Sequence, residues 1–224
     1  AGGQLWTSLS DVLELLAAAA PAQCVQAVHR GSDGDEPVLA KLFTDTDATF
    51  TTSSAHPGLL WALEGLAWSP EHFSLAMEAI ARLVELDPGG RLGNRPNSSF
   101  VSVIAPTFPQ TSATPEARLA VLASLRKLHP ARSWKLLLDL LPGWMGGGTY
   151  NHTPRFRKWG THPKQVSAQE YWKMVEGVVD NLLAMVDENP DRWPELIERI
   201  PDLPGPKRAE IYDRLSRLAD NGKA

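Results

Sequence analysis

Apolar side chains recur along much of this chain at the spacing of one face of an α-helix. Between residues 69 and 87 they fall at intervals of four, three and four positions, at Phe73, Met77, Ile80 and Val84. A helix of about 3.6 residues per turn places all four on one side. Ser69 is a residue type that caps helices, Pro70 is one that starts them, and Pro-Gly-Gly follows at residues 88–90. We therefore predict a helix over residues 69–87.

Two further helices carry clear start signals. Ser167 and Glu170 form an S-x-x-E capping box before a long apolar stripe, which predicts a helix over residues 167–189. Thr114 stands before Pro-Glu and opens a second helix that reaches His129. Proline, glycine or capping residues at both ends predict eight shorter helices, over residues 5–20, 21–30, 37–43, 57–68, 97–105, 131–141, 191–200 and 206–219.

Composition favours helices as well. The chain holds 30 leucines and 26 alanines against 13 valines and 5 isoleucines. Leu and Ala favour helices, whereas Val and Ile favour strands. No segment of four or more residues alternates as a half-buried strand does. Two stretches depart from the helical pattern, a Thr/Ser/Asp-rich one over residues 44–56 and a glycine-rich, basic one over residues 143–165, and both are predicted to be loops.

The spacing of the predicted helices indicates how they are arranged. Short turns between helices of about 10 to 20 residues are typical of stacked helical hairpins. Residues 130–137 and 190–197 resemble each other at an offset of 60, and each follows a long helix. We therefore predict an all-α fold, an irregular α-solenoid of the HEAT or TPR kind, with residues 1–224 as a single helical-array domain.

Length and charge narrow the class of protein. The chain has 224 residues, one cysteine and a formal charge of −4. A lone cysteine cannot form an internal disulfide, so we expect a cytoplasmic protein, and no apolar run reaches the roughly 18 residues of a membrane span. The mild acidity argues against bulk nucleic-acid binding. The first residues, Ala-Gly-Gly-Gln, lack an initiator Met and a signal peptide, which suggests a piece of a larger protein.

The 143–165 loop has a charge opposite to that of the whole chain. It holds four cations and no acid, and aromatic residues alternate with the cations. Such a segment can bind phosphates and stack bases, or contact an acidic partner. The plainer alternative is a loop that packs its aromatic rings on the helices and leaves its charges in water. The candidate partner-binding or anion-binding residues are His152, Arg155, Arg157, Lys158 and Trp159.

A second basic cluster contains Arg91 and Arg95, just before the helix predicted over residues 97–105. Asn97 or Ser98 is placed to cap that helix, whose first N–H groups would also favour an anion. Ordinary capping is the simpler interpretation of the polar residues, and Arg91 and Arg95 are the candidate anion contacts.

Glu64 is the one ionisable residue in the apolar run from residue 59 to 68. A helix that is apolar nearly all round is expected to be central, so Glu64 should be buried, and a buried carboxylate is costly unless it is paired. We predict that Glu64 pairs with an arginine from one of the two basic loops and fixes that loop to the core. The alternative is a catalytic carboxylate that works with a loop histidine.

Other signs of chemistry are missing from the sequence. The six histidines show no metal-ligand spacing, and no P-loop, nucleophile elbow or Rossmann glycine pattern is present. Cys24 lies in a predicted helix, where a small buried thiol is ordinary. We therefore expect no catalytic residue, no metal and no cofactor.

Several phrases of the sequence resemble a helical region of large uncharacterised bacterial proteins. They are residues 59–71, 86–91, 94–96, 109–112, 134–142 and 154–159. In those proteins the region is similar to a C-terminal helical array that follows a STAND-type signalling ATPase module. The resemblance implies a sensor or scaffold role in a multidomain signalling or antiphage protein. Any ATPase activity would then lie outside this sequence, which has no nucleotide-binding motif.

These patterns together predict a non-enzymatic domain that binds a protein partner or a neighbouring domain, with the 143–165 loop as the expected contact. A phosphate-binding or nucleic-acid-binding module using the same loop is the alternative.

Overall fold

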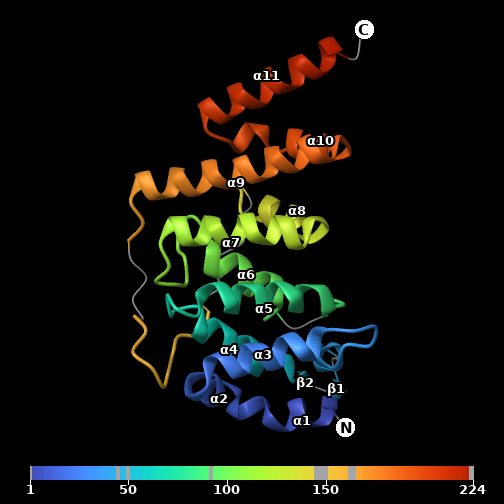
Figure 1. Ribbon diagram of the computed structural model, residues 1–224, viewed down its shortest axis with the longest axis vertical. Helices are drawn as coiled ribbons and strands as arrows, with labels where there is room; N and C mark the ends of the chain where they lie inside the picture. Colours follow the sequence, from blue (N-terminus) through green and yellow to red (C-terminus); the bar gives the residue numbers. More distant parts are fainter. Residues whose placement is uncertain are drawn as a thin grey trace.

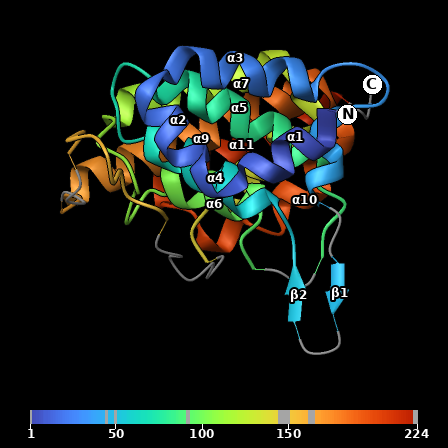
Figure 2. The same ribbon diagram turned by 90° about the horizontal axis from the view of Figure 1, so that it is seen from below.

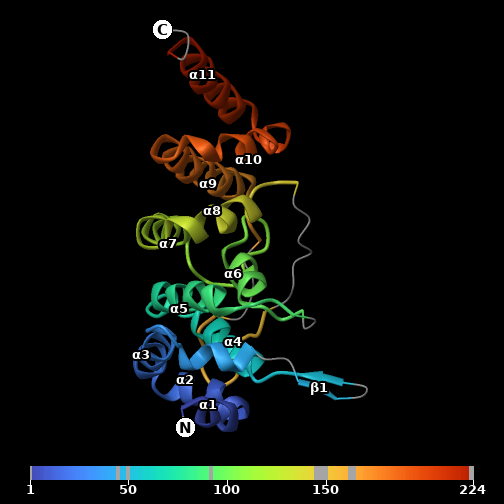
Figure 3. The same ribbon diagram turned by 90° about the vertical axis from the view of Figure 1, so that its right-hand side faces the viewer.

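The computed structural model describes residues 2–43, 46–48, 51–90, 93–143, 151–160 and 165–221. Its helices lie one above another along the long axis of the molecule, with the N-terminus at one end and the C-terminus at the other (Figures 1 and 3). The all-α class predicted from composition and periodicity is confirmed.

The first layer of the stack lies at its N-terminal end. It comprises α1 (Gly2–Leu9), the 3-10 turn η1 (Ser10–Val12), α2 (Leu13–Ala19), α3 (Pro21–Ser32) and the 3-10 segment η2 (Val38–Phe43). One helix was predicted over residues 5–20, and it is divided by η1. Ser10 and Asp11 lie at that point, and side chains of these types compete with the helical backbone for hydrogen bonds.

A short β-hairpin lies within the stretch expected to be a loop over residues 44–56. Strands β1 (Thr46–Ala48) and β2 (Thr51–Ser53) pair antiparallel, with Asp47 opposite Thr52. The hairpin extends away from the stacked helices (Figures 2 and 3). Its strands of three residues are too short to show the alternation that predicts a strand.

The middle of the stack is built from α4 (His56–Leu66), α5 (Phe73–Leu86) and α6 (Pro96–Ile104). Helix α4 packs on α2, α5 and α6, as its apolar sequence predicts. The predicted start of α5 is wrong: Ser69 and Pro70 lie in a turn, and the Ser69 carbonyl accepts a hydrogen bond from the Phe73 N–H. This turn joins α4 to α5 while both Trp68 and Phe73 stay buried.

The C-terminal part contains α7 (Pro115–Leu128), α8 (Pro130–Asp139), α9 (Ala168–Glu188), η3 (Pro190–Arg192), α10 (Trp193–Ile197), η4 (Ile200–Asp202) and α11 (Gly205–Asn221). The single helix predicted over residues 191–200 is wrong: it is divided among η3, α10 and the start of η4, because each of these elements has a proline in its first two positions and proline interrupts a helix. The capping box of α9 is present, with Ser167 accepting from the Glu170 N–H and Glu170 accepting from the Ser167 N–H. Thr114 caps α7 by accepting from the Ala117 N–H.

The two similar sequence segments contact each other in space. Trp134 of α8 donates its indole N–H to Glu195 of α10 at 2.9 Å, and the Arg192 guanidinium lies over the Trp134 ring at 5.3 Å from its centre. A hydrogen bond and a cation–π contact therefore join α8 to the η3–α10 region.

The stack is elongated and has a continuous core. Its accessible surface is 12001 Å², against about 10,000 Å² for a compact monomer of this mass. One cluster of buried apolar residues extends from Leu13 in α2 to Ile211 in α11. The fold thus exposes more surface than a compact domain of this mass would, around one continuous core.

Candidate functional site

The segment over residues 151–160 crosses the side of the stack and is fixed at its start to α4 and α6. The Asn151 amide donates to the Ser99 carbonyl at 3.1 Å, and the His152 backbone N–H donates to Glu64 Oε2 at 2.7 Å. Ser99 Oγ donates to the other oxygen, Glu64 Oε1, at 2.5 Å. A single carboxyl group therefore joins α4, α6 and the start of this segment.

Glu64 is buried, as the sequence predicts, with 2% of its surface exposed. Burial raises the pKa of Glu64 to about 7, against the lowering effect of its bonds to Ser99 and His152, and the nearby Glu14 raises it further. The predicted arginine partner is wrong. A guanidinium would add a second charge that must lose its water, whereas a hydroxyl and a backbone N–H satisfy the carboxyl oxygens as neutral donors.

The imidazole of His152 contacts side chains other than Glu64. Its ring stacks on Trp61, with centres 4.9 Å apart and planes at 16°, and its Nε2 lies 2.8 Å from Glu14 Oε1. His152 was predicted to contact a partner or an anion. In the structure its ring instead packs between the Trp61 ring and the Glu14 carboxylate.

A second pair of contacts fixes the far end of the segment. Arg157 Nε donates to the Ala18 carbonyl at 2.8 Å, at the end of α2. The Trp159 ring meets the His72 ring edge-on, with centres 5.8 Å apart. Both ends of the segment are thus attached to the helices, which gives its middle a defined position.

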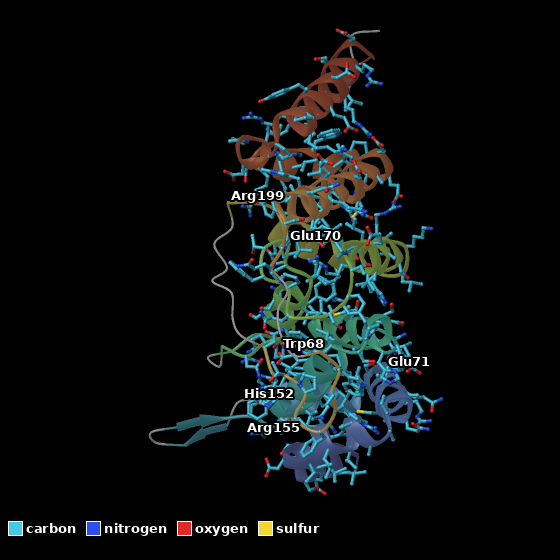
Figure 4. The ribbon with its side chains drawn as sticks, turned by 90° about the vertical axis from the view of Figure 1, so that its left-hand side faces the viewer. Trp68, Glu71, His152, Arg155, Glu170 and Arg199 are labelled. Atoms are coloured by element: carbon cyan, nitrogen blue, oxygen red, sulfur yellow. The ribbon has the colours of Figure 1, made fainter. Side chains whose placement is uncertain are left out.

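The middle of the segment is exposed. Arg155, Phe156, Arg157 and Lys158 all face solvent, and Phe156 is 53% exposed. Trp61 of α4 is 40% exposed and lines the same small cavity as Phe156, Arg155 and Arg157. We call Trp61, Arg155, Phe156, Arg157 and Lys158 the basic–aromatic patch. Figure 4 shows Arg155 beside His152, on the side of the stack that faces the viewer.

The cavity under the patch is small. Its volume is about 20 Å³, which is room for a single water molecule. Glu14 belongs to its lining, but neither Glu64 nor His152 does. Glu64 and His152 are therefore neighbours in the structure, but neither of them borders this cavity.

The second basic cluster differs from the prediction. Arg95 is buried, and its Nη1 lies 3.0 Å from Asp87 Oδ1, so its guanidinium serves an internal ion pair. Neither Asn97 nor Ser98 caps α6, which begins at Pro96 with no side-chain cap. The Asn97 amide instead donates to Asp139 of α8 at 3.2 Å, linking two layers.

Part of the predicted site lies outside the described residues, namely Arg91 and the loop over residues 144–150 and 161–164. Among the residues that are described, no group of His, Cys, Asp and Glu side chains could hold a metal ion. In the same ranges, no helix combines the length and apolar character that crossing a bilayer requires. Cys24 is half-buried in α3, and burial raises the pKa of its thiol to about 11.

Sequence reasoning missed three residues of this region, Glu14, Trp61 and Ser99. Glu14 is a lone charge among leucines, a signal of the same kind that identified Glu64. Trp61 lies in the apolar run of a helix expected to be central, and Ser99 has no sequence signal that separates it from its neighbour Ser98. Their role depends on contacts between residues 35 to 138 positions apart, which no local pattern reports.

In comparisons with known proteins, no family model, no curated protein and no solved structure matches this chain.

Proposed function

We propose that this chain is a non-enzymatic protein-interaction domain, an irregular α-solenoid of stacked helical hairpins that contacts an acidic polypeptide through the basic–aromatic patch. The direct contact between Trp134 and Glu195, which belong to equivalent elements of successive layers, supports the hairpin stack. An elongated array of this kind offers a broad side surface on a rigid core.

The patch itself is the observation that carries the proposal. Exposed Trp and Arg side chains are the residue types that contribute most of the binding energy at protein interfaces. Trp61 and Phe156 expose large parts of their rings beside three cations. The contacts of His152, Arg157 and Trp159 hold these side chains in place, so a partner would not have to order the segment on binding.

The cations of the patch favour an acidic partner. Among the described residues, neither Arg155 nor Lys158 has an ion-pair partner in the protein, whereas Arg82, Arg95, Arg126 and Arg214 are each paired with a carboxylate. A partner segment with Asp or Glu beside an apolar side chain would complement both halves of the patch.

A nucleic-acid or phosphate ligand is the alternative, and two observations weigh against it. The Glu14 carboxylate lines the cavity under the patch, so an acidic group of either ligand class would have to bind at the exposed cations and not in the cavity. His152, a candidate anion contact, is already beside that carboxylate. The cavity is also too small to hold a phosphate or a base.

The resemblance to helical arrays behind STAND-type ATPase modules supports a sensor or scaffold role within a larger bacterial signalling or defence protein. On this proposal the protein is cytoplasmic, the partner is another protein or a neighbouring domain of the same polypeptide, and no cofactor is used.

Selection from a displayed peptide library against the whole chain tests the proposal. We expect enrichment of peptides that combine Asp or Glu with aromatic or aliphatic residues. The double variant Arg155→Ala/Lys158→Ala should bind a selected peptide at least about tenfold more weakly, since two charge contacts are lost. The matched control is Lys127→Ala/Lys135→Ala, which removes two exposed cations from α7 and α8 and should bind as the parent does.

A labelled single-stranded oligothymidylate separates the two ligand classes. Tighter binding of the oligonucleotide than of any selected peptide, lost in the Arg155/Lys158 variant, would support the alternative. Equal peptide binding by the patch variant and the control would overturn the patch as the binding surface.

A further inference from the structure

The N-terminal end of the stack is unusually apolar for an exposed surface. From Gly2 to Ala20 the only charged residues are Asp11 and Glu14, and no lysine or arginine is present. Leu5, Val12, Leu15 and Leu16 are between 42% and 60% exposed. A cluster of large apolar side chains exposed on a surface usually marks a contact site. This end therefore has the character of an interface.

One side of this surface forms an open groove. The groove has a volume of about 530 Å³ and is bordered by α1, α2 and α3. Leu5, Trp6, Leu9 and Leu16 supply much of its apolar lining, and Arg30 of α3 belongs to its edge. Figure 2 looks along the stack onto these helices, which have no further helix in front of them.

The other side of the same helices forms a ridge. Val12 and Leu15 are exposed but do not line the groove, so their side chains face away from it. Asp11 precedes them and is exposed, with only the Ser10 hydroxyl as a hydrogen-bond partner in the described part of the chain. The ridge is thus apolar with one carboxylate.

Ridge and groove are complementary in charge as well as in polarity. The ridge presents the Asp11 carboxylate, and the groove presents the Arg30 guanidinium, which has no ion-pair partner among the described residues. Because one chain carries both halves, a two-fold axis would place each ridge beside the groove of the other copy. A two-fold interface uses the same patch on both subunits and closes on itself.

We propose that two copies of this chain pair end to end through α1, η1, α2 and α3, with the ridge of Asp11, Val12 and Leu15 of each copy in the groove of the other. This interface lies on faces of α2 other than the one beneath the basic–aromatic patch, so it does not depend on the proposed function. Two patches would then be presented by one dimer.

The test is the mass of the whole chain in solution, measured by sedimentation or light scattering up to about 200 µM, where an interface of micromolar Kd is occupied. We expect a monomer–dimer equilibrium. Leu5→Glu in the groove and Leu15→Glu on the ridge should each abolish the dimer, because either change places a carboxylate in an apolar contact. Leu75→Glu, at a leucine of α5 with 42% exposure, is the matched control and should dimerise as the parent does.

Charge exchange shows whether the contact is the one proposed. Asp11→Arg and Arg30→Glu should each weaken the dimer about tenfold, because every dimer loses two ion pairs and gains two repulsions, and the double variant should restore it. Circular dichroism confirms that each variant is folded. A chain that stays monomeric at the highest concentration overturns the proposal. The proposal is also overturned if the Leu5→Glu and Leu15→Glu variants still form dimers, or if the double charge variant does not restore the dimer that the single charge variants weaken. An assembly larger than two copies overturns it as well.

Discussion

Exchange of Glu64 for glutamine makes a direct test of the buried carboxyl group. The amide keeps the shape of the side chain, and it can accept from the His152 N–H with its oxygen while donating to Ser99 Oγ with its nitrogen. The change therefore removes the titratable proton and the charge while it preserves both contacts. Any pH-dependent difference between variant and parent reports the cost of ionising Glu64 in the folded protein.

The magnitude follows from the pKa of Glu64, which burial raises from its ordinary value of 4.5 to about 7. A group with a raised pKa in the folded state holds its proton there more tightly than in the unfolded chain. Its contribution to stability is present below about pH 4.5 and is lost as pH rises through 7. The difference between the two pKa values corresponds to about 3 kcal/mol.

We therefore expect Glu64→Gln to be more stable than the parent at pH 8, by up to about 3 kcal/mol, and equal to it within about 0.5 kcal/mol near pH 4.5. Urea unfolding followed by tryptophan fluorescence at pH 4.5, 6, 7 and 8 measures the difference. Glu71→Gln, at an exposed glutamate with no contact recorded in the described part of the chain, is the control and should show no trend with pH. A Gln variant that is less stable at pH 8, or a difference that does not change with pH, would refute the reasoning.

Two further predictions concern the helices. A Cβ at Gly58 of α4 would lie 2.2 Å from the Ser10 carbonyl oxygen, so Gly58→Ala should lower the free energy of unfolding by about 3 kcal/mol. Gly65, in the same helix, has nothing within 4 Å of such a Cβ, so Gly65→Ala should raise the free energy of unfolding by about 0.5 kcal/mol. Chemical denaturation measures both, and similar effects at the two glycines would contradict the close approach of α4 to η1. Ser167→Ala removes the cap of α9 and should lower the free energy of unfolding by about 1 kcal/mol in the same assay. An unchanged free energy of unfolding would show that the capping box does not stabilise α9.

The start and end of a helix could be predicted wherever the signal is local. Ser167 with Glu170, and Thr114 with the proline after it, act on backbone N–H groups three residues away, so the sequence alone contains the interaction. Ser69 failed as a cap because the turn that it occupies is set by the burial of Trp68 and Phe73, which depends on the helices around them.

The sequence predicted where the site lies but not which groups hydrogen-bond to Glu64. The apolar surroundings of Glu64 in the sequence indicated a buried carboxyl fixing a loop to the core, and the structure has that arrangement. Its partner was wrong because the choice between an arginine and a backbone N–H is made where a distant segment meets α4. Arg95 was misjudged for the same reason, since its pairing with Asp87 requires the chain to turn back between them.

The segment over residues 151–160 also has a consequence for folding. It follows α8 and precedes α9, yet Arg157 bonds to Ala18, 139 positions away, and His152 contacts Glu14, 138 positions away (Figure 1). An array whose layers contact only their neighbours can unfold from its ends, one layer at a time. Here loss of the first layer removes the support of a segment that belongs to the second half. Unfolding of the two halves is thereby coupled, and folding must wait for a long loop to close.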